Sequence, residues 1–181
     1  YSLGWNLAVS TISDILASGG KPIFYAHSMT ISHQFWDNTY IDLFSKGIAN
    51  VLKKCSAGFI GGDMGSSDRW NYTGVAIGEA ENPLTRKGTE PGQLIYMTGF
   101  VGSGNLEAAI KLNANHKLLK PFINNHRLVF PLRIKESELI SKYATACIDS
   151  SDGLLNALNT IADINEVGYE ISNIPYLKSG L

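Results

Sequence analysis

Residues 22–31, PIFYAHSMTI, alternate in a way that predicts a β-strand, with Tyr25 on one face and Phe24 on the other. Before this strand, apolar residues recur at helical spacing from residue 3 to residue 16, which predicts a helix that carries an acid near its end. A second helix is expected at 34–54. Strands and helices alternate here, so the first half of the chain is predicted to be a mixed α/β structure.

Two more strands are expected after these elements. The apolar run AGFIGGD at 57–63 ends in two glycines and an acid, which predicts a buried strand that delivers Asp63 at its end. Residues 70–80 predict a further strand.

Residues 82–92, NPLTRKGTEPG, are polar and contain several Pro and Gly residues. Within them, residues 84–92 are predicted to connect two domains, at 1–83 and 93–181. The second domain is expected to hold a sheet covered by helices. Its predicted elements are a strand at 94–98, a helix at 105–112, an irregular loop at 114–133, a helix at 136–147, a short strand or turn at 148–151, a helix at 153–164 and a strand at 169–172.

The composition is that of a globular protein and narrows the classes of partner. Hydrophobic residues make up 44% of the 181 residues, and the net charge is -1 with dispersed basic residues, which argues against nucleic acid as a partner. No apolar run approaches the roughly 20 residues that a membrane-spanning helix needs. Cys55 and Cys147 lack metal-ligand spacing and fit free thiols of a reducing compartment, so a cytoplasmic location is expected.

The motif with the most chemical content is IDSSDGLL at 148–155, which places two carboxylates and two hydroxyls directly before a predicted helix. Mg²⁺ prefers hard oxygen ligands and usually takes one or two carboxylates together with phosphate and water. Asp149 could therefore bind a metal while Asp152 orients the attacking group. The alternative is that Ser151 or Asp152 only caps the helix, and the residues alone leave both interpretations open.

Two other acids are candidates for the same site. In Gly61-Gly62-Asp63 the glycines would let the backbone approach a ligand closely, although an ordinary glycine turn with a surface acid is the simpler interpretation. Asp14 lies on the first predicted helix, where it is either a metal ligand or a solvated charge.

The segment Thr85-Arg86-Lys87-Gly88 offers a guanidinium that can pair with phosphate oxygens, or an exposed charge of a linker. Residues 99–104, GFVGSG, follow a predicted strand and precede a predicted helix, so their N–H groups could meet an anion. This run lacks the Lys-Ser/Thr ending of a P-loop and is a weak signal.

Taken in order, these motifs resemble those of the thiamine-monophosphate kinase family, in the superfamily that also holds aminoimidazole ribonucleotide synthetase (PurM), selenophosphate synthetase and HypE. The resemblance rests on NLAVSTISDILASGGKP at 6–22, IGGD at 60–63, LTRKG at 84–88, PGQLIYMTG at 91–99 and IDSSDGLL at 148–155.

The resemblance implies an α/β (α+β type) fold in which a PurM-like N-terminal domain is followed by a PurM-like C-terminal domain, both incomplete, and a homodimer that pairs the N-terminal sheets. It implies Mg²⁺-dependent transfer of the ATP γ-phosphoryl group to thiamine monophosphate, giving thiamine diphosphate. By position, the implied metal ligands are Asp14, Asp63 and Asp149, the implied nucleotide contacts are Arg86, Gly62 and Ser151, and the implied catalytic residues are Asp152 and Ser151.

Two departures qualify what the resemblance implies. Residues 64–67, MGSS, stand where the family usually has Thr-Thr-Arg-Gly, which leaves the acceptor open. The family's N-terminal glycine-acid segment and its C-terminal Gly-Gly-Glu-Asp stretch do not occur in these residues, so the chain is expected to be a central fragment that is inactive alone. The alternatives are a related enzyme with another small acceptor, and an inert member that binds nucleotide or dimerises.

Overall fold

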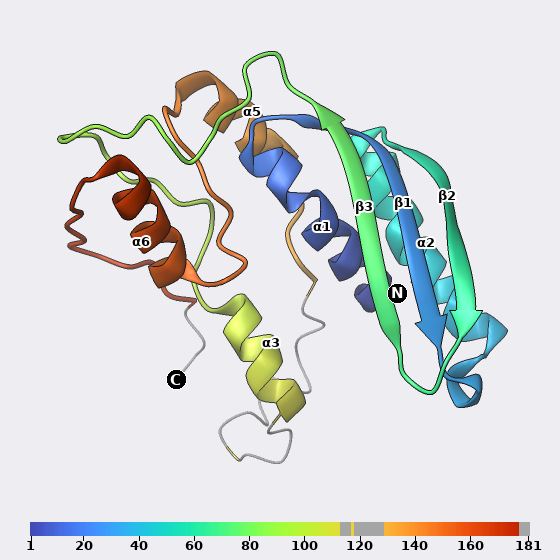
Figure 1. Cartoon of the computed structure of the whole chain (residues 1–181). Helices are drawn as coiled ribbons and strands as arrows, with labels where there is room; N and C mark the ends of the chain where they lie inside the picture. Colours follow the sequence, from blue (N-terminus) through green and yellow to red (C-terminus); the bar gives the residue numbers. More distant parts are fainter. Residues whose placement is uncertain (113–116, 118–128, 178–181) are drawn as a thin grey trace.

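The computed structural model describes residues 1–112, 117 and 129–177, and it has the predicted mixed α/β architecture (Figure 1). The described elements in chain order are α1 (Ser2–Ala17), β1 (Lys21–Ile31), the 3-10 turn η1 (His33–Phe35), α2 (Asn38–Cys55), β2 (Gly58–Ser66), β3 (Asn71–Glu79), α3 (Ser103–Leu112), α5 (Ile134–Tyr143) and α6 (Leu154–Asn165).

The strands form a sheet with the order β2-β1-β3. β1 pairs in parallel with β2 and antiparallel with β3. Parallel neighbours need a long crossover connection, and α2 provides it between β1 and β2. Figure 1 shows α1 and α2 on one face of the sheet, and no helix of the described part covers the other face.

The hydrophobic core lies between the sheet and these two helices. Ile12 of α1, Tyr25 of β1 and Val51 of α2 are all fully buried. The Tyr72 hydroxyl of β3 hydrogen-bonds with the Tyr25 hydroxyl. His27 Nδ1 lies 3.3 Å from the same Tyr72 hydroxyl. The predicted alternation of β1 is confirmed, because Tyr25 faces this core while Phe24 is exposed on the open face.

α1 and α2 cross at two glycines. A Cβ atom at Gly47 would lie 2.6 Å from the backbone nitrogen of Trp5, and a Cβ at Gly4 would lie 2.9 Å from the carbonyl carbon of Phe44. Real Cβ atoms do not approach backbone so closely, so the crossing requires glycine at both positions.

The second helix begins later than the predicted residue 34. Residues 33–35 form the 3-10 turn, and α2 starts after Asp37, whose carboxylate accepts hydrogen bonds from the backbone N–H groups of Thr39 and Tyr40, each at 3.2 Å. A side chain that caps the first N–H groups sets the start of a helix.

Several predictions for the second half of the chain are wrong in the described part. Residues 94–98 and 169–172 are not strands, and α5 ends at Tyr143 rather than at 147. Of the short strand or turn predicted at 148–151, the structure has the turn, in which the Gly153 N–H donates to the Ser150 carbonyl at 3.0 Å. The predicted sheet is reduced to an isolated bridge between Val101 and Tyr176. A strand is stable only when a neighbouring strand shares its backbone hydrogen bonds, and these segments pair with no strand in the part of the chain that the structure describes. Most of the predicted loop at 114–133 lies outside the described residues.

The second half is held against α1. The indole N–H of Trp5 donates to the Phe130 carbonyl at 2.8 Å, and the Phe130 N–H donates to Asn6 Oδ1 at 2.8 Å. At the other end of the helix, the Ser137 hydroxyl donates to the Leu16 carbonyl at 2.7 Å. α1 thus contacts both parts of the chain, and the division at residues 84–92 stays a prediction. None of the described helices is long and apolar enough to cross a membrane.

Candidate active site

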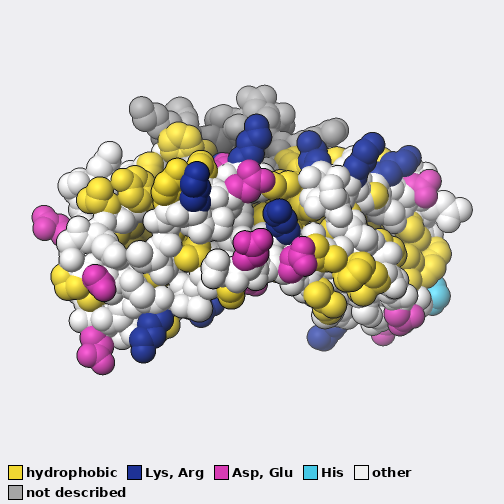
Figure 2. Space-filling model, turned by 90° about the horizontal axis from the view of Figure 1, so that it is seen from above, with side chains coloured by type: hydrophobic (Ala, Val, Ile, Leu, Met, Phe, Trp, Pro, Cys, Tyr) yellow, Lys and Arg dark blue, Asp and Glu magenta, His cyan; other side chains and the backbone are white. Residues whose placement is uncertain are grey.

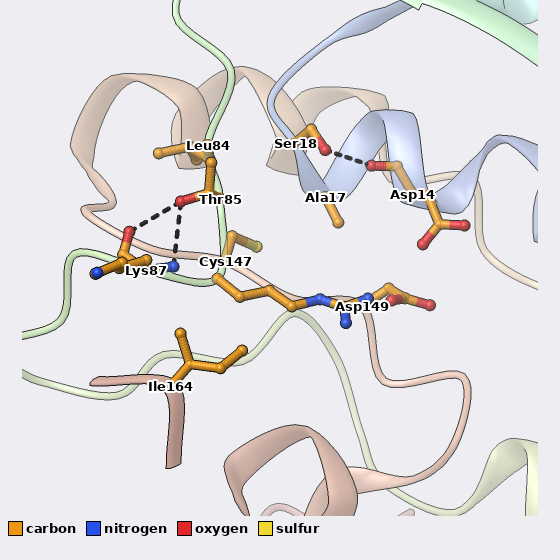
Figure 3. A pocket seen from close by; sticks show the side chains of 10 residues that line it. Asp14, Ala17, Ser18, Leu84, Thr85, Lys87, Cys147, Asp149 and Ile164 are labelled. Atoms are coloured by element: carbon orange, nitrogen blue, oxygen red, sulfur yellow. Dashed lines mark hydrogen bonds between the residues drawn. The ribbon is translucent and has the colours of Figure 1, made fainter. Parts of the chain in front are cut away.

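A pocket of about 630 Å³ lies where the end of α1 meets the segment after the sheet (Figure 3). Its size is within the range of small-molecule sites. Its walls come from α1, from the segment at 84–87, from the segment that precedes α6 and from α6 itself. The lining residues are Asp14, Ala17, Ser18, Leu84, Thr85, Arg86, Lys87, Cys147, Asp149 and Ile164.

Backbone hydrogen bonds bring these segments together. The Leu84 N–H donates to the Ser18 carbonyl at 3.0 Å, which ties the segment after β3 to the end of α1. The Cys147 N–H donates to the Thr85 carbonyl at 3.0 Å, which ties the same segment to the chain before Asp149. Residues far apart in sequence therefore share one pocket.

The two predicted metal ligands Asp14 and Asp149 meet in this pocket. Figure 3 shows the Asp14 side chain pointing from α1 into the space beside Asp149. Burial, the charge of Asp149 and a hydrogen bond between the two carboxyl groups raise the pKa of Asp14, while the nearby Arg86 acts in the opposite direction. A carboxylate that lies beside a second carboxylate is stabilised by a cation between them, so the pair forms a place where a cation is favoured.

This electrostatic strain gives a pH prediction for the metal-free protein. Because the folded-state pKa of Asp14 is raised, the folded state binds more protons than the unfolded state in the window just above the ordinary Asp pKa, and stability falls as pH rises through it. We expect Asp14→Asn to raise the melting temperature at about pH 7 and to raise it less at about pH 4, because a larger share of the Asp14 carboxyl groups is protonated at the lower pH. Thermal unfolding at both pH values checks this, and a variant less stable than the wild type at pH 7 would contradict it.

Asp63 lies elsewhere. It is an exposed residue in the interior of β2, opposite Ser28 of β1, so the prediction of a buried strand that ends at Asp63 is wrong. β2 is an edge strand, and a bulge leaves Ile60 without a partner on β1. Since the bulge shifts the alternation by one residue, Asp63 shares the open face of the sheet with Ser28.

Asp63 and Gly62 do not line the pocket, and no group of three His, Cys, Asp or Glu residues in the described part could hold a metal ion. Gly62 is exposed on β2 opposite His27, and a Cβ there would lie 2.8 Å from the His27 ring. Their predicted roles in metal and nucleotide binding stay predictions.

Ser151 and Asp152 lie in an exposed turn immediately before α6. The interpretation that either side chain caps this helix is wrong, because the N-cap residue is Gly153 and no side chain caps it. Gly153 has a φ of 95°, which glycine tolerates far better than other residues. Neither the Ser151 hydroxyl nor the Asp152 carboxylate lines the pocket, and the catalytic role predicted for these two residues stays a prediction.

Sequence reasoning missed several residues of the pocket, among them Cys147, Thr85 and Ile164. Cys147 had one signal, since it lies two residues before Asp149 in an extended segment and such residues face the same way. Burial raises the pKa of its thiol, so it lines the pocket as a neutral group. Ile164 had no signal beyond the apolar pattern of α6.

Residues 1–80 match the family model described as AIR synthase related protein, N-terminal domain. The first 80 residues are therefore similar to the domains of this family. The match covers α1, α2 and the whole sheet, and it therefore includes Asp14 but neither Arg86 nor Asp149. The resemblance inferred from the sequence motifs is confirmed for this part.

Beyond residue 80, the chain remains similar to curated thiamine-monophosphate kinases. It is 28% identical to the one from Archaeoglobus fulgidus over 95% of this chain and 56% of that protein. It is 30% identical to the one from Bacillus subtilis and 31% identical to the one from Leptospira interrogans, over 93% of this chain in both cases and 54% and 57% of those proteins. The chain spans about half the length of the curated relatives it matches.

Solved structures share the fold. The thiamine monophosphate kinase from Aquifex aeolicus superposes with a TM-score of 0.77 over 91% of this chain and 56% of that one, at 24% identity. A structure described as AaThiL complexed with AMPPCP and TMP gives a TM-score of 0.79 over 91% of this chain and 54% of that one, also at 24% identity. A structure of a HypE-HypF complex gives a TM-score of 0.80 over 97% of this chain and 60% of that one, at 17% identity. These likenesses establish the PurM-like fold.

Proposed function

We propose that this chain is part of a thiamine-monophosphate kinase, which transfers the γ-phosphoryl group of ATP to thiamine monophosphate and forms thiamine diphosphate and ADP. The observation that carries the proposal is the meeting of Asp14 and Asp149 beside Arg86 in one pocket. The choice of acceptor rests on the similarity to curated thiamine-monophosphate kinases of 28–31% identity. A structural neighbour was solved with an ATP analogue and TMP, and its ligands suit the proposed reaction.

Asp14 and Asp149 suit a Mg²⁺ ion. Mg²⁺ is usually bound by one or two carboxylates, with phosphates and water as the remaining ligands, and the pocket supplies such a pair. The raised pKa of Asp14 has the same implication, since a nearby cation relieves the repulsion between the two carboxylates. When bound, Mg²⁺ would neutralise phosphate charge.

The remaining roles are assigned to the chain's own residues. Arg86 would pair with phosphate oxygens of the nucleotide, because a guanidinium matches their geometry with two parallel hydrogen bonds. An oxygen of the acceptor phosphate attacks the γ-phosphorus while the bond to the leaving ADP oxygen breaks, which demands alignment and charge neutralisation rather than a covalent enzyme intermediate. Ser151 and Asp152, in the exposed turn at the start of α6, would contact the acceptor side.

The direct test is turnover by the full-length protein with ATP and Mg²⁺, measured as ADP released with and without thiamine monophosphate. Thiamine is the matched control, because it offers a hydroxyl in place of the acceptor phosphate. With thiamine monophosphate as the acceptor, we expect ADP and thiamine diphosphate to form in equal amounts. With thiamine as the acceptor, we expect neither product. If the protein binds nucleotide but shows no turnover, the acceptor is another molecule. If it shows neither nucleotide binding nor turnover, an inert member of the family is favoured.

We also propose that the open face of the sheet is a homodimer interface. Its apolar side chains include Phe24, Val75 and Ile77, which are 43%, 53% and 52% exposed. They lie on neighbouring strands, because Phe24 and Ile77 are partners across β1 and β3. In Figure 2 hydrophobic side chains gather at the right-hand end of the molecule, the end that carries the sheet. Contiguous exposed apolar surface of this kind marks an interaction site.

This proposal predicts the effect of a charge placed on the open face. In the full-length protein, Val75→Lys should convert a dimer into a monomer, because a charge would be buried without a partner in the interface. Leu139→Lys on α5 is the matched control, since Leu139 is 59% exposed and lies away from the sheet. Light scattering coupled to gel filtration measures the mass. An unchanged dimer in Val75→Lys, or dissociation by the control as well, would contradict the assignment.

A further inference from the structure

The segment that carries Arg86 is held by one side chain outside the pocket lining, Asn165, the last residue of α6. Asn165 Oδ1 accepts hydrogen bonds from the backbone N–H groups of Gly88 and Thr89, at 2.8 and 3.1 Å. Asn165 Nδ2 donates to the Arg86 carbonyl at 2.9 Å and to the Ile161 carbonyl at 2.7 Å.

These four hydrogen bonds use the whole capacity of a side-chain amide, which has two acceptor positions and two donor hydrogens. Three of the four reach the turn at 86–89, and the fourth fixes the amide to its own helix. No other residue type of this length both accepts from two N–H groups and donates to two carbonyls, so the arrangement is specific for asparagine.

The turn itself has a shape that needs such a clamp. Gly88 has a φ of 124°, and a Cβ there would lie 2.8 Å from the Thr145 carbonyl oxygen. The turn therefore packs tightly on the chain before Asp149 in a conformation that only glycine adopts readily. The Thr85 carbonyl just before Arg86 is held by the Cys147 N–H, and the Arg86 carbonyl is held by Asn165.

Both peptide groups that flank Arg86 are thus fixed, and its side chain starts from a defined point in the wall that faces Asp14 and Asp149. We propose that Asn165 is a positioning residue that sets the place of the Arg86 guanidinium, and that it acts on nucleotide binding through Arg86 alone. This inference rests on the proposed function, in which Arg86 contacts the phosphates of the nucleotide.

The variants that test the inference are Asn165→Ala, Asn165→Asp and Arg86→Ala, with the double variant of Arg86 and Asn165. Asn165→Asp keeps the acceptor for Gly88 and Thr89 but loses the donor to the Arg86 carbonyl, so it decides the matter should the alanine variant fail to fold. Asn159→Ala is the matched control, because Asn159 lies on the same helix and its side chain contacts Tyr169 instead.

In the full-length protein, steady-state kinetics should show that Asn165→Ala and Asn165→Asp raise the KM for ATP about 10-fold with little change in kcat, as for lost uniform binding. Arg86→Ala should raise the KM for ATP as well. Adding Asn165→Ala to Arg86→Ala should cause no further rise in this KM, since the effects of two substitutions that act through one group are not additive. The melting temperature and kinetics of Asn159→Ala should stay near those of the wild type.

An equal additional rise in the Arg86→Ala background, or no effect of either Asn165 variant, would overturn the inference while the kinase activity of the wild type stands. A wild type that does not turn over ATP with thiamine monophosphate and does not bind nucleotide would instead overturn the proposed function, and the positioning role with it. The two failures are therefore distinguishable.

Discussion

Replacing Asp149 by Asn in the full-length protein is expected to lower kcat by about 10²–10³-fold, the range found when one group that stabilises transition-state charge is removed. The amide has the same shape as the carboxylate, but it cannot carry the charge that a Mg²⁺-phosphate site requires. Because the raised pKa of Asp14 depends partly on Asp149, the fold itself should gain rather than lose stability.

The control for this prediction is Asp163→Asn on the exposed side of α6, which makes the same chemical change outside the pocket. Steady-state turnover and thermal unfolding are measured for both variants. Full activity of Asp149→Asn would remove this residue from the metal site, and a large fall in melting temperature would show that it serves the fold.

Replacing Gly47 by Ala is expected to destabilise the protein by about 2 kcal/mol or more, the upper part of the range for overpacking a tight contact. The new Cβ would lie 2.6 Å from the backbone nitrogen of Trp5, and backbone cannot rotate away as a side chain can. The two helices would have to separate along their crossing, and this loss outweighs the gain of about 1 kcal/mol that alanine brings to a helix interior.

Gly104→Ala is the matched control, because Gly104 is also helical, in α3, and a Cβ there meets nothing within 4 Å. Its effect should be neutral or slightly stabilising. Urea unfolding gives the free energy of unfolding for both variants. A Gly47→Ala variant as stable as the wild type would contradict the close crossing of α1 and α2.

The elements with a clear period in the sequence are the ones that could be predicted. The alternation at 22–31 and the helical spacing at 3–16 gave β1 and α1 nearly to the residue. Asp63 was misplaced because its face depends on the bulge at Ile60, and a bulge depends on pairing with β1 rather than on the local pattern. Leu94 and Tyr96 belong to an apolar run that pairs with no strand of the described residues, and they are 77% and 85% exposed.

The types of residue in the site could be predicted from the sequence, but the position in the fold where these residues meet could not. Asp14, Arg86 and Asp149 were each close to an ordinary surface charge when taken alone, and their order along the chain supported a common site. Their meeting depends on backbone hydrogen bonds between distant segments, such as that from Cys147 to Thr85, which no local pattern encodes. The role of Asn165 could not be predicted for the same reason, because its hydrogen-bond partners Arg86, Gly88 and Thr89 lie more than 70 residues away in sequence.

We propose that Asp14, Asp149 and Arg86 form one Mg²⁺-nucleotide site. Calorimetric titration of the full-length protein with a non-hydrolysable ATP analogue, with and without Mg²⁺, tests it most directly. We expect one nucleotide to bind per chain, with an affinity that depends on Mg²⁺, and we expect Asp14→Asn to remove this dependence on Mg²⁺. Nucleotide binding of equal strength without Mg²⁺, or a Mg²⁺ dependence that survives in Asp14→Asn, would contradict it.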